Sequence, residues 1–392
     1  MSTYIIDGAR TAFTSFGGSF VNITADELGA VTAKEAMKRS NVSPEMIDHV
    51  IYGNVIHTHT NAAYLARHIG LKAGIPKEVP ALTLNRLCGS GAQSIVTAAQ
   101  HILLDEADII LAGGAENMSM APFSNFKQRF QGNKYGALKF EDMLLSTLTD
   151  EYAGSGMGMT AEKLAEQYNI SREEQDEYAL LSQKRASEAQ QSGRFAREIV
   201  PVTVQVKKES FEISKDEHIR HGLTNEQLAR LKPSFKSDGT VTAGNSSGIN
   251  DGAASVIVAS EKAVNEHNLK PIAKIVSWGV AGVDPSIMGI GPVPAIKQAL
   301  KRANLTLDDI DLIEVNEAFA AQYLAVEKEL GLDREKTNVN GGAIALGHPV
   351  GVSGTRLLLT LSYELNERGL KYGVASLCIG GGQGIAVIIE SV

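Results

Sequence analysis

The pattern of apolar and polar positions in the N-terminal part of the chain predicts strands that alternate with helices. Residues 4–7 and 49–55 are short apolar runs with the length of strands, and residues 25–39 have the apolar periodicity of a helix. The next predicted elements are a helix over residues 62–73 capped by Asn61, a strand over 80–87, a helix over 92–104 and a strand over 107–112 that ends in Gly113-Gly114. This order is typical of βαβ units, so the sequence predicts an α/β fold.

The periodic pattern breaks down between residues 116 and 248, where Met, Phe, Gly and Lys occur without a clear period. Two helical stretches interrupt this region, and the second begins with the capping box Ser171–Glu174 and ends at Gly193. Strand–helix alternation returns at residues 251–260. We therefore predict a loop domain inserted into the first of two larger domains. The predicted division is residues 1–118 with 249–269, then 119–248, then 270–392.

One segment of the first domain recurs near the C-terminus. Residues 34–50 and 297–313 align without gaps. The identical pairs are Lys34/Lys297, Ala36/Ala299, Lys38/Lys301, Arg39/Arg302, Asn41/Asn304, Ile47/Ile310 and Asp48/Asp311. We therefore predict two similar βαβ halves. Packed about a pseudo-twofold axis, they would bring the catalytic loops of both halves together.

Composition and charge narrow the class of protein. The chain has 392 residues, of which 43% are hydrophobic and 21% charged, as in ordinary globular proteins. The net charge of −8 argues against binding nucleic acid or an anionic membrane, and no apolar run is long enough to cross a bilayer. Two cysteines without a disulfide framework indicate a reducing compartment, and the N-terminus has no basic targeting pattern. The expectation is a cytoplasmic protein.

The first candidate for chemistry is Cys88, in the segment Asn-Arg-Leu-Cys-Gly-Ser-Gly at residues 85–91. A thiol with an ordinary pKa of about 8.5 is mostly protonated near neutrality. The N-terminus of the following helix or a histidine base would favour the thiolate. The alternative is that Cys88 is a small core residue, as free cysteines usually are. Cys88 taken alone does not exclude that alternative.

His348 is the histidine best framed to act as a base. It stands in the glycine-rich segment 341–351, before a helix predicted to be capped near Ser353. The other histidines flank loops or lie on predicted helices, where a structural role is the simpler interpretation, and none has metal-ligand spacing with the cysteines. The sequence therefore predicts a functional His348 and no metal site.

Two further segments carry candidate residues. Residues 375–384 place Cys378 before three successive glycines that start at Gly380, and their backbone N–H groups can approach a ligand oxygen. Neither a dinucleotide-binding fingerprint nor a Walker or Gly-x-Ser-x-Gly motif occurs. Asn316 follows the strand of the repeat, at the strand ends where α/β sheets bind ligands. Such a set suits a reaction in which one thiol carries an acyl group while a second exchanges a proton with a carbon acid or leaving thiol.

At these segments the chain resembles the thiolases, over essentially its full length. The four similar motifs are the nucleophile motif at residues 85–91, Asn-Glu-Ala-Phe at 316–319, Gly-His-Pro within 341–351 and Cys-x-Gly-Gly-Gly at 378–382. The resemblance implies the five-layered αβαβα thiolase fold, built from two similar βαβ halves. It also implies that the inserted loop domain covers coenzyme A.

The resemblance also implies a role for each reactive residue. Cys88 would be the acyl-accepting nucleophile, His348 its activating base, and Cys378 the acid/base acting on the second substrate's α-carbon or on the leaving thiol. Asn316, through a water, and His348 would stabilise one oxyanion, and the backbone N–H groups of Cys88 and Gly380 the other. The implied reaction is a reversible ping-pong Claisen condensation of two acetyl-CoA to acetoacetyl-CoA through acyl-Cys88, with thiolysis as its reverse.

Coenzyme A is implied as a substrate, with no permanently bound cofactor. Ser247 in the segment 242–248 would contact the pantetheine, and Arg220 would meet the nucleotide end. The implied residues of the coenzyme A and acyl site are Leu148, Met157, Arg220, Phe235, Ala243, Gly244, Ser247, Met288, Ala318 and Phe319. Basic residues between Lys207 and Lys236 suit a phosphate-rich ligand, although most of them, taken singly, fit a solvated surface charge.

The predicted length of the substrate's acyl chain depends on Gly156. Short-chain biosynthetic thiolases usually have a histidine before the methionine equivalent to Met157, and here that residue is Gly156. Degradative 3-ketoacyl-CoA thiolases also lack this histidine, whereas Met288 resembles the biosynthetic type. The expectation is an acetyl-CoA acetyltransferase, with a degradative 3-ketoacyl-CoA thiolase acting on longer chains as the alternative.

Two other classes of protein are disfavoured, and the resemblance also implies an assembly of subunits. A non-catalytic thiolase-fold carrier of lipid or acyl groups is disfavoured because all four reactive residues are present. A ketosynthase is disfavoured by Cys378 in its glycine-rich turn. The resemblance implies small-molecule acyl-CoA partners and a homodimer or homotetramer whose outer contacts come from the loop domain.

Overall fold

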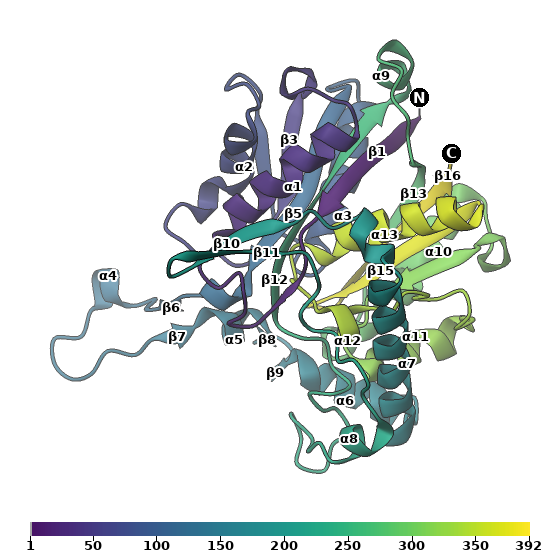
Figure 1. Ribbon diagram of the computed structural model, residues 1–392. Coiled ribbons are helices and arrows are strands. Elements are labelled where there is room, and N and C mark those ends of the chain that lie inside the picture. Colours follow the sequence, from purple (N-terminus) through teal and green to yellow (C-terminus); the bar gives the residue numbers. More distant parts are fainter. Residues whose placement is uncertain (1) are drawn as a thin grey trace.

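The computed structural model describes residues 2–392 (Figure 1). Within that range ten strands form one hydrogen-bonded sheet, whose path runs β4-β3-β5-β12-β1-β13-β16-β15-β14, with β2 paired to β12 at the side. The strands of the first half are β1 (Thr3–Arg10), β2 (Thr14–Ser15), β3 (His49–Gly53), β4 (Ala81–Leu84), β5 (Ile109–Asn117) and β12 (Asn250–Ser260). Those of the second half are β13 (Ala273–Gly282), β14 (Leu312–Val315), β15 (Tyr372–Ile379) and β16 (Gln383–Ser391).

The strand directions are the same in both halves. In the first half β3 runs parallel to β4 and β5, and β12 runs antiparallel to β5 and β1. In the second half β14 runs parallel to β15, and β16 runs antiparallel to β15 and β13. A single parallel bridge from Ile313 to Thr337 stands in the place of β4. The halves join where β1 pairs antiparallel with β13 at residues 3–5, so the strand order is mirrored about that pair.

The sequence repeat occupies the same place in each half. It covers the end of α1 (Ala25–Arg39) and the start of β3 in the first half, and the end of α10 (Pro292–Ala303) and the start of β14 in the second. Asn41 and Asn304 both take the left-handed backbone, with φ of 53° and 54°, which asparagine tolerates. Asp48 Oδ2 accepts two backbone N–H groups at the start of β5, and Asp311 Oδ2 accepts two at the start of β15, all at 2.8–2.9 Å. The predicted pair of similar halves is confirmed.

Helices on the two outer faces and between the two halves of the sheet complete the five layers. α1 and α2 (Leu65–Ala73) cover the outer face of the first half, and α10 and α11 (Ala320–Leu330) that of the second. α3 (Ser90–Leu103) and α13 (Ser353–Arg368) pack together between the halves (Figure 1). Their close approach requires glycine, because a Cβ at Gly91 would lie 2.7 Å from Thr355 N and one at Gly354 would lie 2.3 Å from Ala92 N. Two short helices, α9 (Glu261–Glu266) and α12 (Ala343–Leu346), lie in connections.

The segment between β5 and β12 forms elements of its own. Its helices are α4 (Gln128–Gln131), α5 (Met143–Thr147), α6 (Met157–Gln167), α7 (Arg172–Gln191) and α8 (Asn225–Ala229). Its strands are β6 (Phe123–Ser124), β7 (Glu141–Asp142), β8 (Thr149–Asp150), β9 (Ser155–Gly156), β10 (Val202–Val206) and β11 (Glu209–Ile213). Figure 1 shows β6, α4 and β7 as an arm that projects from the body. The predicted capping box of α7 is confirmed, since Ser171 Oγ accepts Glu174 N at 3.1 Å and Ser171 N donates to the Glu174 carboxylate at 2.7 Å.

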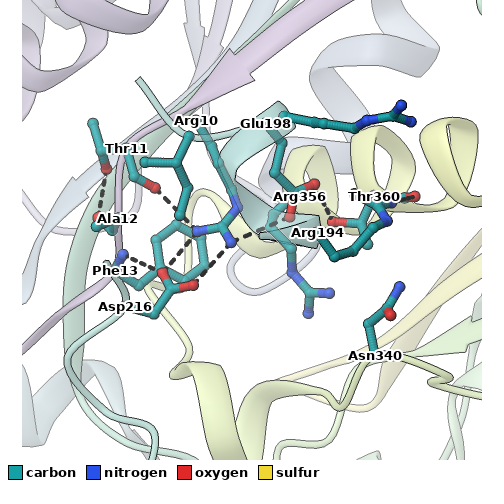
Figure 2. Close-up of polar contacts among 12 residues, drawn as sticks. Arg10, Thr11, Ala12, Phe13, Arg194, Glu198, Asp216, Asn340, Arg356 and Thr360 are labelled. Atoms are coloured by element: carbon teal, nitrogen blue, oxygen red, sulfur yellow. Dashed lines mark hydrogen bonds and ion pairs between the residues drawn. The ribbon is translucent and has the colours of Figure 1, made fainter. Parts of the chain in front are cut away.

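A buried charge cluster ties this inserted segment to both halves (Figure 2). Arg10 at the end of β1 donates to the two carboxylate oxygens of Asp216, at 2.7 and 2.9 Å, and to Glu198 Oε1 at 3.2 Å. Glu198 Oε2 accepts the hydroxyl of Thr360, on α13, at 2.8 Å. All four side chains are buried, so removing the guanidinium would leave two carboxylates uncompensated in the interior.

Several boundaries differ from the prediction, among them those at Asn61 and at the end of β5. Asn61 does not cap the helix after it: its φ of −107° and ψ of 15° are not extended, its side chain makes no capping bond, and a 3-10 turn precedes α2. β5 does not end at Gly113-Gly114 but continues to Asn117, because both glycines pair with β12. A side chain would not fit there, since a Cβ at Gly114 would lie 2.1 Å from Gly351 O. The longer strand carries Glu116 into the interior.

Candidate active site

Cys88 lies in a tight turn between β4 and α3. Leu87 has a φ of 47°, and the Ser90 hydroxyl accepts the Arg86 N–H at 2.8 Å and donates to Leu87 O at 2.7 Å. α3 begins at Ser90, two residues earlier than predicted. A Cβ at Gly89 would lie 2.5 Å from Ile379 Cδ1, so only glycine lets the turn approach the strand that carries Cys378. The turn therefore brings the two cysteine segments together.

The thiol of Cys88 is not acidified by the fold. It is half-buried against Ile56, Met118, Leu144 and Val350. Burial raises the pKa of Cys88 to about 11, although the backbone N–H of Gly380 opposes the shift. Burial therefore acts against the lowering of this pKa that is expected from the helix N-terminus. Cys88 is a neutral thiol at rest and needs a base.

His348, the predicted base, has a fixed ring orientation. Its backbone N–H donates to Asn250 Oδ1 at 3.0 Å, and its Nδ1 lies 2.6 Å from the Ser353 hydroxyl. That hydroxyl donates its one hydrogen to Pro349 O at 3.1 Å, so it accepts from Nδ1–H. The lone pair of the ring is then on Nε2, which lies 3.4 Å from Asn316 Nδ2. Ser353 does not cap α13 as predicted, because its hydroxyl is engaged by His348 and Pro349.

The imidazole of His348 is held neutral. Burial and the nearby cation of Arg356 lower its pKa to about 4. With a neutral thiol at Cys88, the resting pair carries no charge.

Cys378 is the last but one residue of β15, before the glycine turn. It is buried against Met288 and Ala318. Burial and the neighbouring Cys88 thiol raise the pKa of Cys378, which places the two sulfurs close together. In the turn, Gly381 and Gly382 both have a φ of 78°, which favours glycine. Cys378 is therefore a protonated thiol beside the nucleophile.

Asn316 follows β14 directly, as predicted. Its backbone N–H donates to Ser376 O at 2.9 Å, and its side chain is fully buried. Oδ1 has no hydrogen-bond partner among the described residues, which fits the water-holding role expected of this amide. The next residue, Glu317, fixes the local chain through four accepted hydrogen bonds, from Tyr178, Ser182, Asn338 and Ile344.

A cavity of about 570 Å³ lies in the inserted segment. Four of the predicted coenzyme A residues line it, namely Arg220, Phe235, Ala243 and Ser247. Ser247 N donates to Ala318 O at 3.0 Å, which connects the cavity wall to the cluster that contains Cys378. Gly244 is placed differently: it is buried, and a Cβ there would lie 2.5 Å from Leu228 Cδ2, so it packs the loop against α8 instead of lining the cavity.

The remaining predicted residues gather at the thiols. Met157, Met288, Ala318 and Phe319 pack in one cluster with Cys378, and Leu148 packs in the cluster that contains Cys88. A Cβ at Gly380 would lie 3.3 Å from Met157 Sδ, so the glycine turn and the start of α6 are in contact. The rings of Phe235 and Phe319 meet edge to face at 6.0 Å and continue this apolar wall toward the cavity.

Sequence reasoning missed four residues at or behind the site. Glu116 and Asn250 bind the backbone of the His348 loop, Ser353 sets the tautomer of its ring, and His218 lines the cavity. Only Glu116 gave a signal, as an acidic residue at the end of an otherwise apolar strand. The other contacts arise between segments distant in sequence or across one turn. Among the described residues, no helix has the length and apolarity to span a bilayer, and no cluster of potential ligands has the arrangement of a metal site.

Two thiols and a neutral imidazole on loops of both halves form a set that suits acyl transfer through a cysteine. The family described as the thiolase N-terminal domain matches residues 3–262, and the thiolase C-terminal domain matches residues 269–391. The chain therefore belongs to the thiolase family. The predicted family and fold are confirmed.

Relatives of this chain carry two activities in their descriptions. The chain is 56% identical over 389 residues to the mitochondrial 3-ketoacyl-CoA thiolase of Homo sapiens, with 99% of this chain and 98% of the relative covered. It is 49% identical to an acetyl-CoA acetyltransferase of Syntrophomonas wolfei, with the same coverage. The crystal structure of the human mitochondrial 3-ketoacyl-CoA thiolase in complex with CoA has a TM-score of 0.96 and 55% identity, and covers 100% of this chain and 98% of that one.

The expected cytoplasmic location is contradicted by these relatives. The human enzyme and four other mammalian relatives, at 54–56% identity, are all described as mitochondrial. The prediction failed because free cysteines indicate a reducing environment, which does not by itself identify one compartment.

Proposed function

We propose that this chain is a 3-ketoacyl-CoA thiolase, which cleaves a 3-ketoacyl-CoA with coenzyme A into acetyl-CoA and a shorter acyl-CoA. The observation that carries the choice is the space at Gly156, beside Met157. A Cβ there would meet only Leu148 O at 3.5 Å and Thr149 Oγ1 at 3.9 Å. Relatives described as 3-ketoacyl-CoA thiolases, at 54–56% identity, support it over those described as acetyl-CoA acetyltransferases, at 48–50%.

In the first half-reaction the Cys88 sulfur attacks the 3-keto carbon. The thiol proton passes to Nε2 of His348 as the carbon–sulfur bond forms, and the backbone N–H groups of Cys88 and Gly380 receive the oxyanion. The bond between C2 and C3 then breaks, and its electron pair goes to C2. The Cys378 thiol protonates C2, which releases acetyl-CoA and leaves the shortened acyl group on Cys88. Asn316 and His348 stabilise the thioester enolate that forms on the way.

The second half-reaction restores the enzyme. The Cys378 thiolate takes the proton of the incoming coenzyme A thiol, which attacks the acyl-Cys88 carbonyl. The Cys88 sulfur leaves as the tetrahedral intermediate collapses and recovers its proton from His348. Cys88 therefore regains its own proton, whereas the proton that Cys378 gave to C2 is replaced by that of the coenzyme A thiol, and no redox cofactor or metal takes part in the sequence.

The inserted segment supplies the coenzyme A site in this proposal, with residues 119–248 as its domain. Ser247 and Phe235 border the pantetheine path, and the exposed Arg220 lies where it can meet the nucleotide phosphates. The human relative crystallised with CoA supports a ligand of this class. Phe16 and His218 join the predicted set, because both line the same cavity.

The experiment that tests the proposal is thiolysis, followed by the loss of 3-ketoacyl-CoA absorbance. We expect kcat/KM for 3-ketodecanoyl-CoA to equal or exceed that for acetoacetyl-CoA. Gly156→His narrows the pocket. It should lower kcat/KM for the longer substrate by about 10-fold or more relative to kcat/KM for the shorter one. Its backbone accepts the change, since φ is −72°. Much faster turnover of acetoacetyl-CoA by the wild type would establish an acetyl-CoA acetyltransferase instead, which the Syntrophomonas relative favours.

A homo-oligomer, dimeric or tetrameric, is the proposed assembly. β4 ends the sheet with one unpaired edge and an exposed Leu82. The projecting arm exposes several aromatic side chains, among them Phe130 at 92% and Tyr135 at 99%. Surfaces of this kind mark contacts with other chains. Light scattering of the purified protein tests the assembly, and a monomer at micromolar concentration would refute it.

A further inference from the structure

Glu116 is a buried acid at the end of β5 that no basic side chain pairs with among the described residues. Its carboxylate accepts four hydrogen bonds. Oε1 accepts from Asn54 Nδ2 at 3.0 Å and Ile56 N at 3.1 Å, and Oε2 accepts from Val55 N at 2.9 Å and Gly351 N at 3.0 Å. A buried carboxylate is costly unless it is fully bonded, so these contacts hold the surrounding backbone firmly.

The four donors belong to different halves of the molecule. Asn54, Val55 and Ile56 follow β3 in the first half, whereas Gly351 lies three residues after His348 in the second. The fit around Gly351 is tight, because a Cβ there would lie 2.5 Å from Glu116 Oε2 and 3.2 Å from the Cα of Asn54. One carboxylate therefore sets the position of the His348 loop relative to the first half.

The same loops form the wall around the nucleophile. Ile56 and Val350 pack with Cys88 in one cluster, and Val55 borders it. Glu116 bonds the backbone of Val55 and Ile56 directly and reaches Val350 through the adjoining Gly351. Any shift of the carboxylate thus moves the thiol's wall and the loop of its base in relation to each other.

We propose that Glu116 is a positioning residue for acyl transfer: its carboxylate clamps the loop that carries His348 to the loop that walls Cys88. The proposal rests on the proposed thiolase function and adds to it a residue that touches neither substrate nor the reacting atoms. Proton transfer between Cys88 and His348 depends on their separation, and a misplacement of about 1 Å can cost about 100-fold in rate.

The charge of Glu116 gives a signature that a purely structural residue would lack. Its negative charge is one of the influences that raise the pKa of Cys88, after burial. Burial raises the pKa of Glu116 itself to about 8, while the N–H groups of Ile56, Val55 and Gly351 oppose that shift. Above pH 8 the group is therefore ionised, and its removal lowers the pKa of the thiol.

Two variants distinguish the effect of the position of the Glu116 carboxylate from the effect of its charge. Glu116→Gln removes the charge and leaves an amide nitrogen facing backbone donors, whereas Gly351→Ala keeps the charge and displaces the carboxylate. We expect each to lower kcat of thiolysis by about 10-fold to 100-fold without a matching rise in KM for coenzyme A. Only Glu116→Gln should also shift the pH dependence of iodoacetamide alkylation of Cys88, measured between pH 8 and 11, to lower pH.

Asp48→Asn is the matched control, since Asp48 accepts two backbone N–H groups at the opposite end of the same strand. It should change neither kcat nor the alkylation profile. Wild-type kcat in both test variants overturns the proposal, as does a loss of kcat that Asp48→Asn reproduces. If Glu116→Gln does not fold, kcat of Gly351→Ala decides alone. A wild type without thiolysis would refute the proposed function itself, which is a different outcome from these.

Discussion

The turns before α3 and α13 use one serine for two purposes. Ser353 stands as far after Ser90 as Lys297 stands after Lys34, and each is the first residue of its helix. The Ser90 hydroxyl bonds only backbone, accepting Arg86 N and donating to Leu87 O, so it closes the turn of the nucleophile. The Ser353 hydroxyl donates to Pro349 O in the same way but accepts from the ring of His348. A duplicated turn thus holds a thiol in one half and orients its base in the other.

The site is therefore built from two similar turns whose serines have taken different roles. Close packing of Gly91 against Thr355 and of Gly354 against Ala92 brings the two helix N-termini together. Neither half alone holds both the nucleophile and a base. The asymmetry of the pair, with Cys88 on one side and His348 and Cys378 on the other, can be tested by changing each side separately.

The largest effect is expected from the two cysteines. Cys88→Ala should lower thiolysis by about 10⁴-fold to 10⁶-fold, as for other lost nucleophiles. Cys378→Ala should also block turnover but only slow the acylation of Cys88 by acetyl-CoA, because that step needs no proton at carbon and coenzyme A can leave as its thiolate. Mass spectrometry of the peptide that contains Cys88 distinguishes them. An unacylated Cys88 in the Cys378→Ala variant would contradict the separate roles.

The second effect concerns the pH dependence of stability. The pKa of His348 is lowered in the fold to about 4, so the unfolded chain binds a proton first as pH falls. Its contribution to stability is complete above about pH 6.5, where neither state is protonated, and is lost at about 1.4 kcal/mol per pH unit below that, a total loss of about 3 kcal/mol near pH 4. Urea unfolding of the wild type and of His348→Asn at pH 7 and pH 5 measures it. Equal pH dependence in both proteins would show that the imidazole is not held neutral.

The third effect separates the two serines. Ser353→Ala should lower kcat by about 10-fold to 100-fold, since the ring loses the partner that places the proton on Nδ1. Ser90→Ala should instead lower the free energy of unfolding by about 1–3 kcal/mol, because Arg86 N and Leu87 O lose their partner. Steady-state kinetics and thermal unfolding of both variants test the contrast. Matching losses in the two variants would mean that the serines have not diverged.

The smallest effect tests the part of the duplication that has not diverged. Asp48→Asn and Asp311→Asn remove the same charged acceptor from the same place in each half. We expect each to lower the free energy of unfolding by about 1 kcal/mol, with kcat unchanged. A difference between the two much larger than that value in chemical unfolding would indicate that the halves are not energetically equivalent here.

The candidate reactive residues, the repeat and most of the elements could be predicted from residue types and their spacing alone. The glycine-rich segments around Cys88, His348 and Cys378 are short motifs whose chemistry depends on residue type. The repeat at residues 34–50 and 297–313 predicted two halves because local hydrogen bonds, such as those of Asp48 and Asp311, recur at fixed spacing. Helix periods such as that of α1 follow from the same local rules.

The charge state of the thiol and the alignment of the loops around it depend on the tertiary structure. The pKa of Cys88 rises because Met118, Leu144 and Val350, distant in sequence, exclude water from the sulfur. Glu116 reaches Gly351 only because β5 continues past two glycines that pack against the other half. Desolvation and hydrogen bonds between distant segments depend on where the chain is brought together in space, and residue spacing does not encode them.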